Sequence, residues 1–436
     1  MSKTKTSRKN QFIVLILMIL SLETIYVLPY IRYTFFEPLQ QAMGLVGEAE
    51  KFGNTMSIYG LFNVIFYLPG GIIADRFSPK KLLVFSMISS GALGLWLSTW
   101  PSYEIILVIH ALWAFTTVLT YWSASIKVVN LIAGSDEQGG MYSALEGGRG
   151  VVTLALNAVW IAAFSYFAKK IVDTTEGNIK GITFLVIVVS VIMILVGLLM
   201  QFLFPKMEAE GVSNTNMKES LRAILGTFKL PITWVLIVMI FVSSTANAVA
   251  AYYAPYLQAF AGLTVVATGT FQAVRAQGSR LAASAVFGFA STRMKRSTFM
   301  LIVGCVIALV GSLALVGVAP SNSTLILMMI IMVVISFASY GNRSLYWAII
   351  DEAGTPKMMV GSVVGAASLL GYLPDTFIHT LFGNWLDNLE PLVAYKRIFT
   401  FLLIVAAVGI VVAIFGEKIV VKYKKSLPAK EETAAE

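Results

Sequence analysis

The sequence predicts an all-α membrane protein with twelve transmembrane helices arranged in two pseudo-symmetric halves of six. Hydrophobic residues make up 57% of the 436 residues and charged residues only 13%, a composition that excludes a soluble chain of this length. Twelve apolar runs follow one another, separated by charged or Gly/Pro-containing turns. A basic motif after the second run returns in weaker form after the eighth, and this repeat indicates two matching halves.

The first six spans are expected within residues 1–204. They lie near 11–35, 53–74, 82–99, 104–130, 140–168 and 181–204. A helix of about 20 apolar residues crosses the hydrocarbon core of a bilayer, and each run is close to that length. The first run follows basic residues as a signal peptide would, but no small-residue cleavage site comes after it. We therefore expect it to remain as the first span.

The polar connection at 205–230 is expected to separate the two halves. Its second part places Leu221, Leu225 and Phe228 on one side, which is typical of an amphipathic helix on the cytoplasmic membrane surface. The second half is expected at 231–417, followed by a cytoplasmic tail at 418–436. Its spans lie near 231–259, 267–290, 298–318, 324–350, 359–385 and 393–416.

The distribution of basic residues predicts the orientation. Of the 32 Lys and Arg residues, 20 fall in the tails and connections on one side of the twelve spans and 6 in the connections on the other. Basic residues collect on the cytoplasmic side of membrane proteins. We therefore expect a multi-pass protein of the cell membrane with both termini in the cytoplasm. The net charge of +9 then reflects topology, and no nucleic-acid partner is expected.

The segment between the second and third spans, Gly71 to Lys81, holds a charged motif. Gly71 is predicted where two helices approach closely, and Asp75 is placed to stabilise the N-terminus of a neighbouring helix. Arg76 and Lys80 would keep the loop in the cytoplasm. The segment resembles the corresponding loop of the major facilitator superfamily, a family of secondary transporters. The resemblance implies a gating latch between two rocking halves, and a topogenic turn is the alternative.

A weaker copy of this motif runs from Gly288 to Arg296, after the eighth span. The two copies begin 217 residues apart, which is close to half of the chain. Thr292 stands in the second copy where Asp75 stands in the first. We therefore expect a second latch that lacks its acid and is weaker than the first.

Four stretches in both halves resemble the organophosphate:phosphate antiporter family, which transports glycerol phosphate and hexose phosphates. They are Arg32-Tyr-Thr-Phe35, Asp75-Arg76-Phe-Ser78-Pro79-Lys80, Glu137-Gln-Gly139-Gly140 and the run from Pro356 to Leu373. The first is similar to a family motif whose arginine binds the substrate phosphate, so the resemblance implies this role for Arg32. Register from the third stretch places Arg149 at a histidine that contacts the substrate in the family.

Two other positions of that family's site carry uncharged residues in this chain. Asn247, eight residues before Pro255, stands where the family has its second phosphate-binding arginine. Tyr67 stands at a lysine of the glycerol phosphate transporter. The resemblance therefore implies Asn247 and Tyr67 as substrate-binding residues, with one family arginine kept and one replaced.

Charged residues inside the spans mark candidate sites, because a charge at the bilayer centre costs roughly 2.5 to 3.5 kcal/mol on insertion scales. The cations are Arg32, Lys127, Arg149, Arg275, Arg280 and Arg343, and the acids are Glu23, Glu146 and Asp375. The excess of cations favours an anionic substrate. A guanidinium can bind an oxyanion through two hydrogen bonds, but it can also join two helices. Both roles are open for Arg275, Arg280 and Arg343.

Arg149 lies about ten residues into the fifth span, or ~15 Å at 1.5 Å per residue, and so near the midplane. It is the first candidate for the substrate anion, although Glu146 on the same helical face could neutralise it. Asp375 and His379, four residues apart in the eleventh span, are candidates with Glu23 for carrying a proton. Asp375 and His379 could instead be counter-ions for the arginines of the second half.

The sequence predicts a secondary active transporter that moves a small organic anion by alternating access. A sugar phosphate, a sugar acid or another carboxylate would satisfy the buried arginines. The alternatives are a proton-coupled exporter of drugs or cations and a non-transporting sensor with the same fold. With one Cys, two His and no nucleotide-binding loop or hydrolase motif, we expect no enzyme, no metal and no cofactor. Its expected partners are the substrate and the bilayer, and we expect a monomer.

Overall fold

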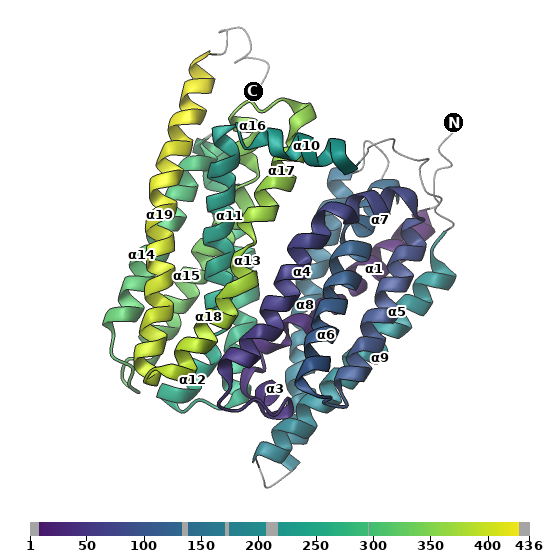
Figure 1. Ribbon diagram of the computed structural model, residues 1–436, viewed down its shortest axis with the longest axis vertical. Helices are drawn as coiled ribbons and strands as arrows, with labels where there is room; N and C mark the ends of the chain where they lie inside the picture. The colour runs from purple at the N-terminus through teal and green to yellow at the C-terminus, as the bar shows by residue number, and fades with distance from the viewer. Residues whose placement is uncertain (1–7, 133–137, 171–173, 206–216, 295, 427–436) are drawn as a thin grey trace. The chain divides into compact units, whose positions relative to one another are not determined.

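The computed structural model describes residues 8–132, 138–170, 174–205, 217–294 and 296–426, and every regular element in these ranges is a helix (Figure 1). Each of the twelve predicted spans coincides with one helix or one group of consecutive helices, which confirms the predicted all-helical fold. Glycine and proline at the turns set several boundaries. Pro79, Pro231 and Pro391 each begin a helix at the position where a missing N–H costs nothing.

The first span is a broken helix, and the fourth contains a π-helical stretch. The helices of the first six spans are α1 (Arg8–Ile25), α2 (Val27–Tyr30), η1 (Ile31–Tyr33), α4 (Ala49–Arg76), α5 (Pro79–Leu97), α6 (Tyr103–Ala114), η2 (Phe115–Trp122), α7 (Ser123–Ile132), α8 (Gln138–Lys170) and α9 (Thr174–Leu203). A short helix, α3 (Phe36–Ala42), joins the first two spans. In η2 the hydroxyls of Thr117 and Thr120 donate to main-chain carbonyls four residues earlier, and such bonds accompany local distortion of a helix.

The remaining six spans follow α10 (Met217–Thr227). They are formed by α11 (Pro231–Ala250), α12 (Tyr253–Ala261), α13 (Val265–Met294), α14 (Ser297–Gly317), α15 (Leu325–Leu345), α16 (Ala348–Glu352), α17 (Lys357–Gly371), α18 (Pro374–Asn388) and α19 (Pro391–Ser426). In α10 the side chain of Ile224 is buried where this helix contacts α17, whereas the side chains of Leu221 and Leu225 are exposed. The apolar side predicted from the sequence is therefore the exposed one, as expected for a helix whose outer face meets lipid.

Eight stretches within the described residues are long and apolar enough to cross a membrane. The four spans that fall short are α4, α8, α13 and the pair α17 and α18. These are the second and fifth spans of each predicted half, so low hydropathy occurs at the same positions in both halves. They also carry most of the charged residues found inside spans. A span of low hydropathy needs protein or substrate, and not lipid alone, against part of its surface.

Contacts divide the chain into two compact units. The first comprises the described residues within Met1–Thr215, Leu263–Gln277 and His379–Asp387, and the second those within Asn216–Gly262, Gly278–Ile378 and Asn388–Glu436. Compared with the predicted first half, the first unit also includes the start of α13 and the second half of α18. The division into halves at 1–204 and 231–417 stays a prediction.

The first unit is held together by close packing of α5 against α9. A Cβ added to Gly91 would lie 2.6 Å from the main-chain oxygen of Ser190, so no larger residue fits without moving a helix. Close approach of small residues is a main source of helix association in membranes, where lipid is as apolar as the side chains.

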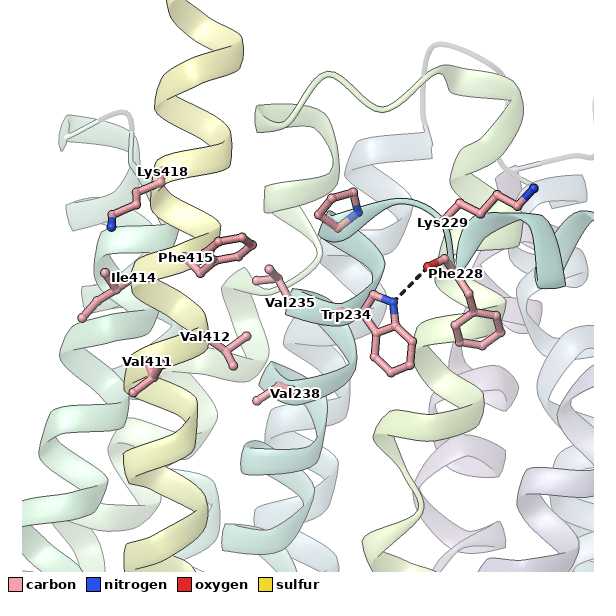
Figure 2. Close-up of a pocket in the computed structure, with 11 residues that line it drawn as sticks. Phe228, Lys229, Trp234, Val235, Val238, Val411, Val412, Ile414, Phe415 and Lys418 are labelled. Atoms are coloured by element: carbon pink, nitrogen blue, oxygen red, sulfur yellow. Dashed lines mark hydrogen bonds between the residues drawn. The ribbon is translucent and has the colours of Figure 1, made fainter.

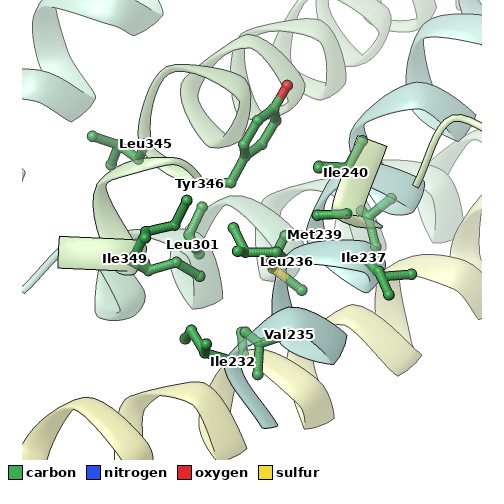
Figure 3. Packing of buried hydrophobic residues seen from close by; sticks show 14 of the residues in the cluster. Ile232, Val235, Leu236, Ile237, Met239, Ile240, Leu301, Leu345, Tyr346 and Ile349 are labelled. Carbon is green, nitrogen blue, oxygen red and sulfur yellow. The ribbon is translucent and has the colours of Figure 1, made fainter. Parts of the chain in front are cut away.

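The core of the second unit packs α11 against α14, α15, α16 and α19 (Figure 3). Leu236, Leu301 and Ile349 are fully buried there. Cys305, the single cysteine, is also fully buried in this core and accepts a hydrogen bond from Asn342 at 3.5 Å. The second unit therefore has a continuous apolar interior that fixes α11 and α19 beside each other.

Candidate functional site

The close helix approach expected in the first charged motif falls one residue earlier than predicted. A Cβ added at Gly71 would have no described atom within 4 Å, whereas a Cβ at Gly70 would lie 3.2 Å from the main-chain oxygen of Leu119 in η2. One residue turns an α-helix by about 100°, so Gly71 faces away from η2. Within the first unit the residue in contact with η2 is therefore Gly70 and not Gly71, and the gating role of Gly71 stays a prediction.

One lysine of this motif, Lys80, and a lysine of the fourth span, Lys127, are anchored on the ends of helices. Lys80 donates to the main-chain oxygen of Phe204 at 2.7 Å, just after α9, and Lys127 donates to that of Ala74 at 3.3 Å, near the end of α4. Cations are stabilised at helix C-termini, where unpaired carbonyls concentrate partial negative charge. Arg76 is exposed, and the side chain of Asp75 lies outside the described residues. The gating role of this loop stays a prediction.

The second copy of the motif obtains its acids from other helices. Thr292 is exposed, but Glu417 of α19 forms an ion pair with Arg296, with 2.6 Å between Nε and Oε1, and accepts a hydrogen bond from Thr298. Glu352 of α16 accepts the first main-chain N–H of α14, from Ser297, at 3.0 Å. Sequence reasoning missed both acids because they lie far along the chain from the motif.

Glu23 and Arg149, two charged residues inside spans of the first unit, form an ion pair. Arg149 of α8 donates from Nε to Oε1 of Glu23 in α1 at 2.6 Å, and the two side chains are only 18% and 9% exposed. The hydroxyl of Thr153, one turn along α8, donates to the other carboxylate oxygen of Glu23. The side chain of Glu146, the partner considered from the sequence, lies outside the described residues. The predicted proton carrier and the predicted anion ligand are thus direct neighbours.

A tyrosine cluster, formed by Tyr26, Tyr30, Tyr59, Tyr67 and Tyr121, lies beside this pair. Tyr26 is close enough to Arg149, Tyr67 and Tyr121 to interact with each electrostatically. The rings of Tyr26 and Tyr121 meet edge to face at 6.3 Å, and those of Tyr30 and Tyr59 at 5.7 Å. Edge-to-face pairs are a favourable aromatic geometry.

Polar groups at the edge of the tyrosine cluster come from η2 and α1. Tyr59 shares a hydrogen bond of 3.0 Å with Thr117, and Tyr121 shares one of 2.6 Å with Ser21. Asn63 lies one turn from both Tyr59 and Tyr67 on α4, and its buried Oδ1 has no hydrogen-bond partner among the described residues. In the sequence, Tyr67 was identified as a candidate only through the family resemblance, and Asn63 and Tyr59 were not identified.

Arg32 is buried at the end of the first span, with 2% of its surface exposed. Its Nη1 donates to the main-chain oxygen of Phe52 at 3.1 Å, and its guanidinium lies 4.3 Å from the centre of the Phe52 ring. It also lies 5.3 Å from the centre of the Phe36 ring. Cation–π contacts of this kind gain strength when water is excluded. They attach η1 to α3 and α4, and substrate binding by Arg32 stays a prediction.

The second half of α18 packs along the start of α4 within the first unit. Both carboxylate oxygens of Asp387 accept main-chain N–H groups of α4, those of Ala49 and Glu50, each at 2.7 Å. The hydroxyl of Thr380 donates to Asn54 at 2.7 Å. Asp387 therefore caps a helix whose own N-cap residue makes no side-chain cap, a contact that the sequence did not predict.

His379 and Asp375, both on α18, have different surroundings. His379 is fully buried in the first unit, with its ring 6.2 Å from that of Tyr33 and close enough to Arg32 to interact electrostatically. Asp375 belongs to the second unit, where it is within electrostatic range of Arg343. The pairing of Asp375 with an arginine, considered from the sequence, agrees with this position.

The remaining predicted site residues are divided between the two units, with Arg275 in the first and Asn247, Arg280 and Arg343 in the second. Arg275 is buried and donates from Nε to Gln272 at 2.8 Å. Arg343 is exposed near the end of α15, and Asn247 and Arg280 are half-buried on α11 and α13. Their roles in substrate binding stay predictions.

Two ionisable groups outside the spans have shifted pKa values. Burial raises the pKa of the Glu37 carboxyl above its usual value, and the hydrogen bond from Lys51 to Glu48 raises the pKa of the Lys51 ammonium. Lys51 therefore stays charged at neutral pH. Glu37 is the group outside the spans to control for when pH dependence is measured.

Known proteins resemble the chain over most of its length. The family model of the Major Facilitator Superfamily matches residues 12–379. The inner membrane protein YqcE of Escherichia coli (strain K12) is 33% identical over 392 residues, which cover 88% of this chain and 89% of that protein.

Two solved structures share the fold at low sequence identity. A D-xylose-proton symporter has a TM-score of 0.72 with 14% identity and covers 94% of this chain and 97% of its own. An inward-facing, unoccupied bacterial homologue of the human lysosomal transporter Spinster has a TM-score of 0.71 with 13% identity, covering 96% and 99%. These are membrane transporters and not enzymes. The chain therefore belongs to the Major Facilitator Superfamily, as a multi-pass membrane transporter.

Proposed function

We propose that this transporter moves a small organic anion, such as a sugar phosphate, a sugar acid or another carboxylate, across the cell membrane together with a proton. Arg149 would bind the anion and Glu23 would carry the proton. The observation that carries the proposal is the 2.6 Å ion pair between these two residues in the middle of their spans. Substrate and proton would therefore act on a single pair of charges.

The ion pair supplies a mechanism for coupling. While Glu23 is ionised it neutralises Arg149, and an anion would have to compete with a carboxylate already in place. Protonation of Glu23 removes that competitor and leaves the guanidinium to bind an oxyanion through charge-assisted hydrogen bonds. Release of both to the other side restores the pair. A ligand shifts a conformational equilibrium only by its different affinities for the states, and this exchange of partners supplies such a difference.

The tyrosine cluster supports a substrate with several hydroxyl groups. Tyrosine rings offer apolar faces for the C–H groups of a sugar, and their hydroxyls offer hydrogen bonds. The buried Oδ1 of Asn63, on the face of α4 that carries Tyr59 and Tyr67, would accept one more hydrogen bond. A sugar acid or a sugar phosphate therefore fits this surface better than a simple aliphatic carboxylate.

The resemblance to organophosphate:phosphate antiporters supports a second form of coupling, exchange against inorganic phosphate. Under this alternative Arg149 would bind the two substrates in turn. Glu23 would carry no proton and would only neutralise Arg149 while no substrate is bound. An exporter of cations is disfavoured, because the described acids Glu23 and Asp375 each lie near an arginine. Both termini are proposed to be cytoplasmic because 20 basic residues fall on that side.

The test is uptake by purified protein in liposomes across a panel of labelled sugar phosphates and sugar acids. Each compound is offered with an imposed proton gradient or with phosphate inside, and Arg149→Gln is compared with Lys180→Gln. Lys180 is an exposed cation paired with Glu176, so it controls for the loss of one charge. Proton-driven uptake that only Arg149→Gln abolishes supports the proposal. Uptake driven by phosphate alone would replace it with exchange, and transport of cations alone would overturn it.

A further inference from the structure

The second unit has an open groove between the first turns of α11 and the second half of α19 (Figure 2). Its volume is about 710 Å³, within the range of about 300–1,000 Å³ typical of small-molecule sites. The lining residues are Phe228, Lys229, Pro231, Trp234, Val235, Val238, Val411, Val412, Ile414, Phe415 and Lys418. Nine of these eleven are apolar, so the groove has a hydrocarbon-like wall.

The wall of the groove is fixed by internal contacts. The indole N–H of Trp234 donates to the main-chain oxygen of Phe228 at 2.9 Å, and the two rings lie 5.6 Å apart. Val235 packs against Gly416, which holds α11 and α19 together beneath the groove. Trp234 and Phe415 nevertheless remain 50% and 57% exposed, so they line the groove without filling it.

Among the described residues that line the groove, the charged ones are two lysines. Lys229 precedes α11 and Lys418 lies on α19, and Figure 2 shows them at its two sides, near its upper end. The described lining includes no acid. The neighbouring carboxylate of Glu417 is engaged by Arg296 and Thr298, so it does not neutralise Lys418. The groove therefore combines an apolar wall with positive charge at one end.

We propose that this groove binds an anionic phospholipid of the surrounding bilayer. Val411 and Phe415, at 68% and 57% exposure, lie on spans that must meet lipid in a membrane-spanning protein. An acyl chain would lie along these side chains, and the headgroup phosphate would lie at the end of the groove that the two lysines flank, where either flexible side chain could turn toward it. Basic residues at the membrane boundary attract anionic lipids, and tryptophan is enriched at that depth. The expected cytoplasmic position of this end favours the same lipid class.

Native mass spectrometry of the purified protein, titrated with phosphatidylglycerol or phosphatidylcholine in detergent, tests the proposal. We expect the first phosphatidylglycerol to bind about tenfold more tightly than phosphatidylcholine, and Lys229→Gln/Lys418→Gln to remove this preference. The matched control is Arg222→Gln/Arg293→Gln, which removes two exposed cations of the same unit outside the groove. An equal loss in the control, or no preference in the unmodified protein, would overturn the proposal.

A second pair of variants tests the apolar wall without changing charge. Val411→Trp should fill the groove and weaken binding of the first phosphatidylglycerol. Val310→Trp places the same side chain at an exposed position on α14 and should leave that binding unchanged. Both positions are exposed, so neither change disturbs the core. If the Val411→Trp variant binds the lipid as tightly as the unmodified protein does, the acyl chain does not lie in this groove and the proposal fails.

Discussion

At the scale of single residues, the main feature of the first unit is an ion pair between two side chains of opposite charge. Glu23 and Arg149 are each largely withdrawn from water, and each satisfies the other. Breaking a buried pair by removing one partner leaves an uncompensated charge, which costs more than removing both. Thr153 adds a third contact that fixes the carboxylate. Under the proposed function, coupling and stability would both depend on this pair.

Glu23→Gln is expected to abolish accumulation driven by a proton gradient while preserving exchange of labelled for unlabelled substrate. A glutamine is uncharged at every pH, so it no longer competes for Arg149 and no longer responds to protons. The two activities are compared in the same liposomes at several pH values. Glu37→Gln is the control, because burial raises the pKa of that carboxyl outside the spans. A gradient-driven signal that survives in Glu23→Gln would place the proton elsewhere.

The stability of the pair is testable by a double-mutant cycle in detergent. Arg149→Met alone leaves the Glu23 carboxylate without its cation and should lower the free energy of unfolding by about 3 kcal/mol. Glu23→Gln/Arg149→Met removes both charges and should recover most of that loss. Thermal unfolding of the three variants measures the coupling. Simple additivity of the two single effects would mean that the ion pair contributes nothing to folding.

At the scale of elements, α4 is held at both ends by residues from elsewhere in the chain. Asp387 of α18 caps its N-terminus, and Lys127 of α7 reaches a carbonyl near its C-terminus. Gly70, within the last two turns of α4, lies close to η2. The helix that carries Tyr59 and Tyr67 is therefore positioned by other spans, and its own capping contributes little.

Asp387→Ala should destabilise the first unit by about 1–2 kcal/mol, the cost of losing a helix cap. The two main-chain N–H groups of Ala49 and Glu50 would lose their acceptors. Unfolding followed by intrinsic fluorescence in detergent measures the change, and Asp351→Ala, at an exposed aspartate of the second unit, is the control. Equal stability of Asp387→Ala and the unmodified protein would show that water replaces the carboxylate.

The sequence predicted the number and order of the spans because apolar length is a local property. It could not predict the partners of the charges, since Glu23 and Arg149 are 126 residues apart and Asp387 and Ala49 are 338 apart. Arg149 was identified as a candidate because a charge inside an apolar run stands out without any structure. The sequence indicated Gly71 instead of Gly70 as the contact residue, because an apolar pattern does not define the face of a helix to within one residue.

At the scale of the whole molecule, the expected orientation places the connections of the two sides in different compartments. Cys305 is the only native cysteine and is buried, so an introduced thiol would be labelled over little background. In intact cells a membrane-impermeant maleimide should label Lys180→Cys and not Lys81→Cys, both at exposed positions. Permeabilised cells should label both. The reverse pattern in intact cells would invert the topology.

The weak hydropathy of three of the four less apolar spans has a consequence for how the protein is made. Each of α8, α13 and α18 is followed directly by one of the three most apolar stretches, with mean hydropathy 3.2, 2.8 and 3.1. A nascent span that carries charges partitions poorly into lipid on its own. The following stretch can retain it at the translocon until the two enter the bilayer as a hairpin. The charged spans thus depend, during biosynthesis, on the apolar spans that follow them.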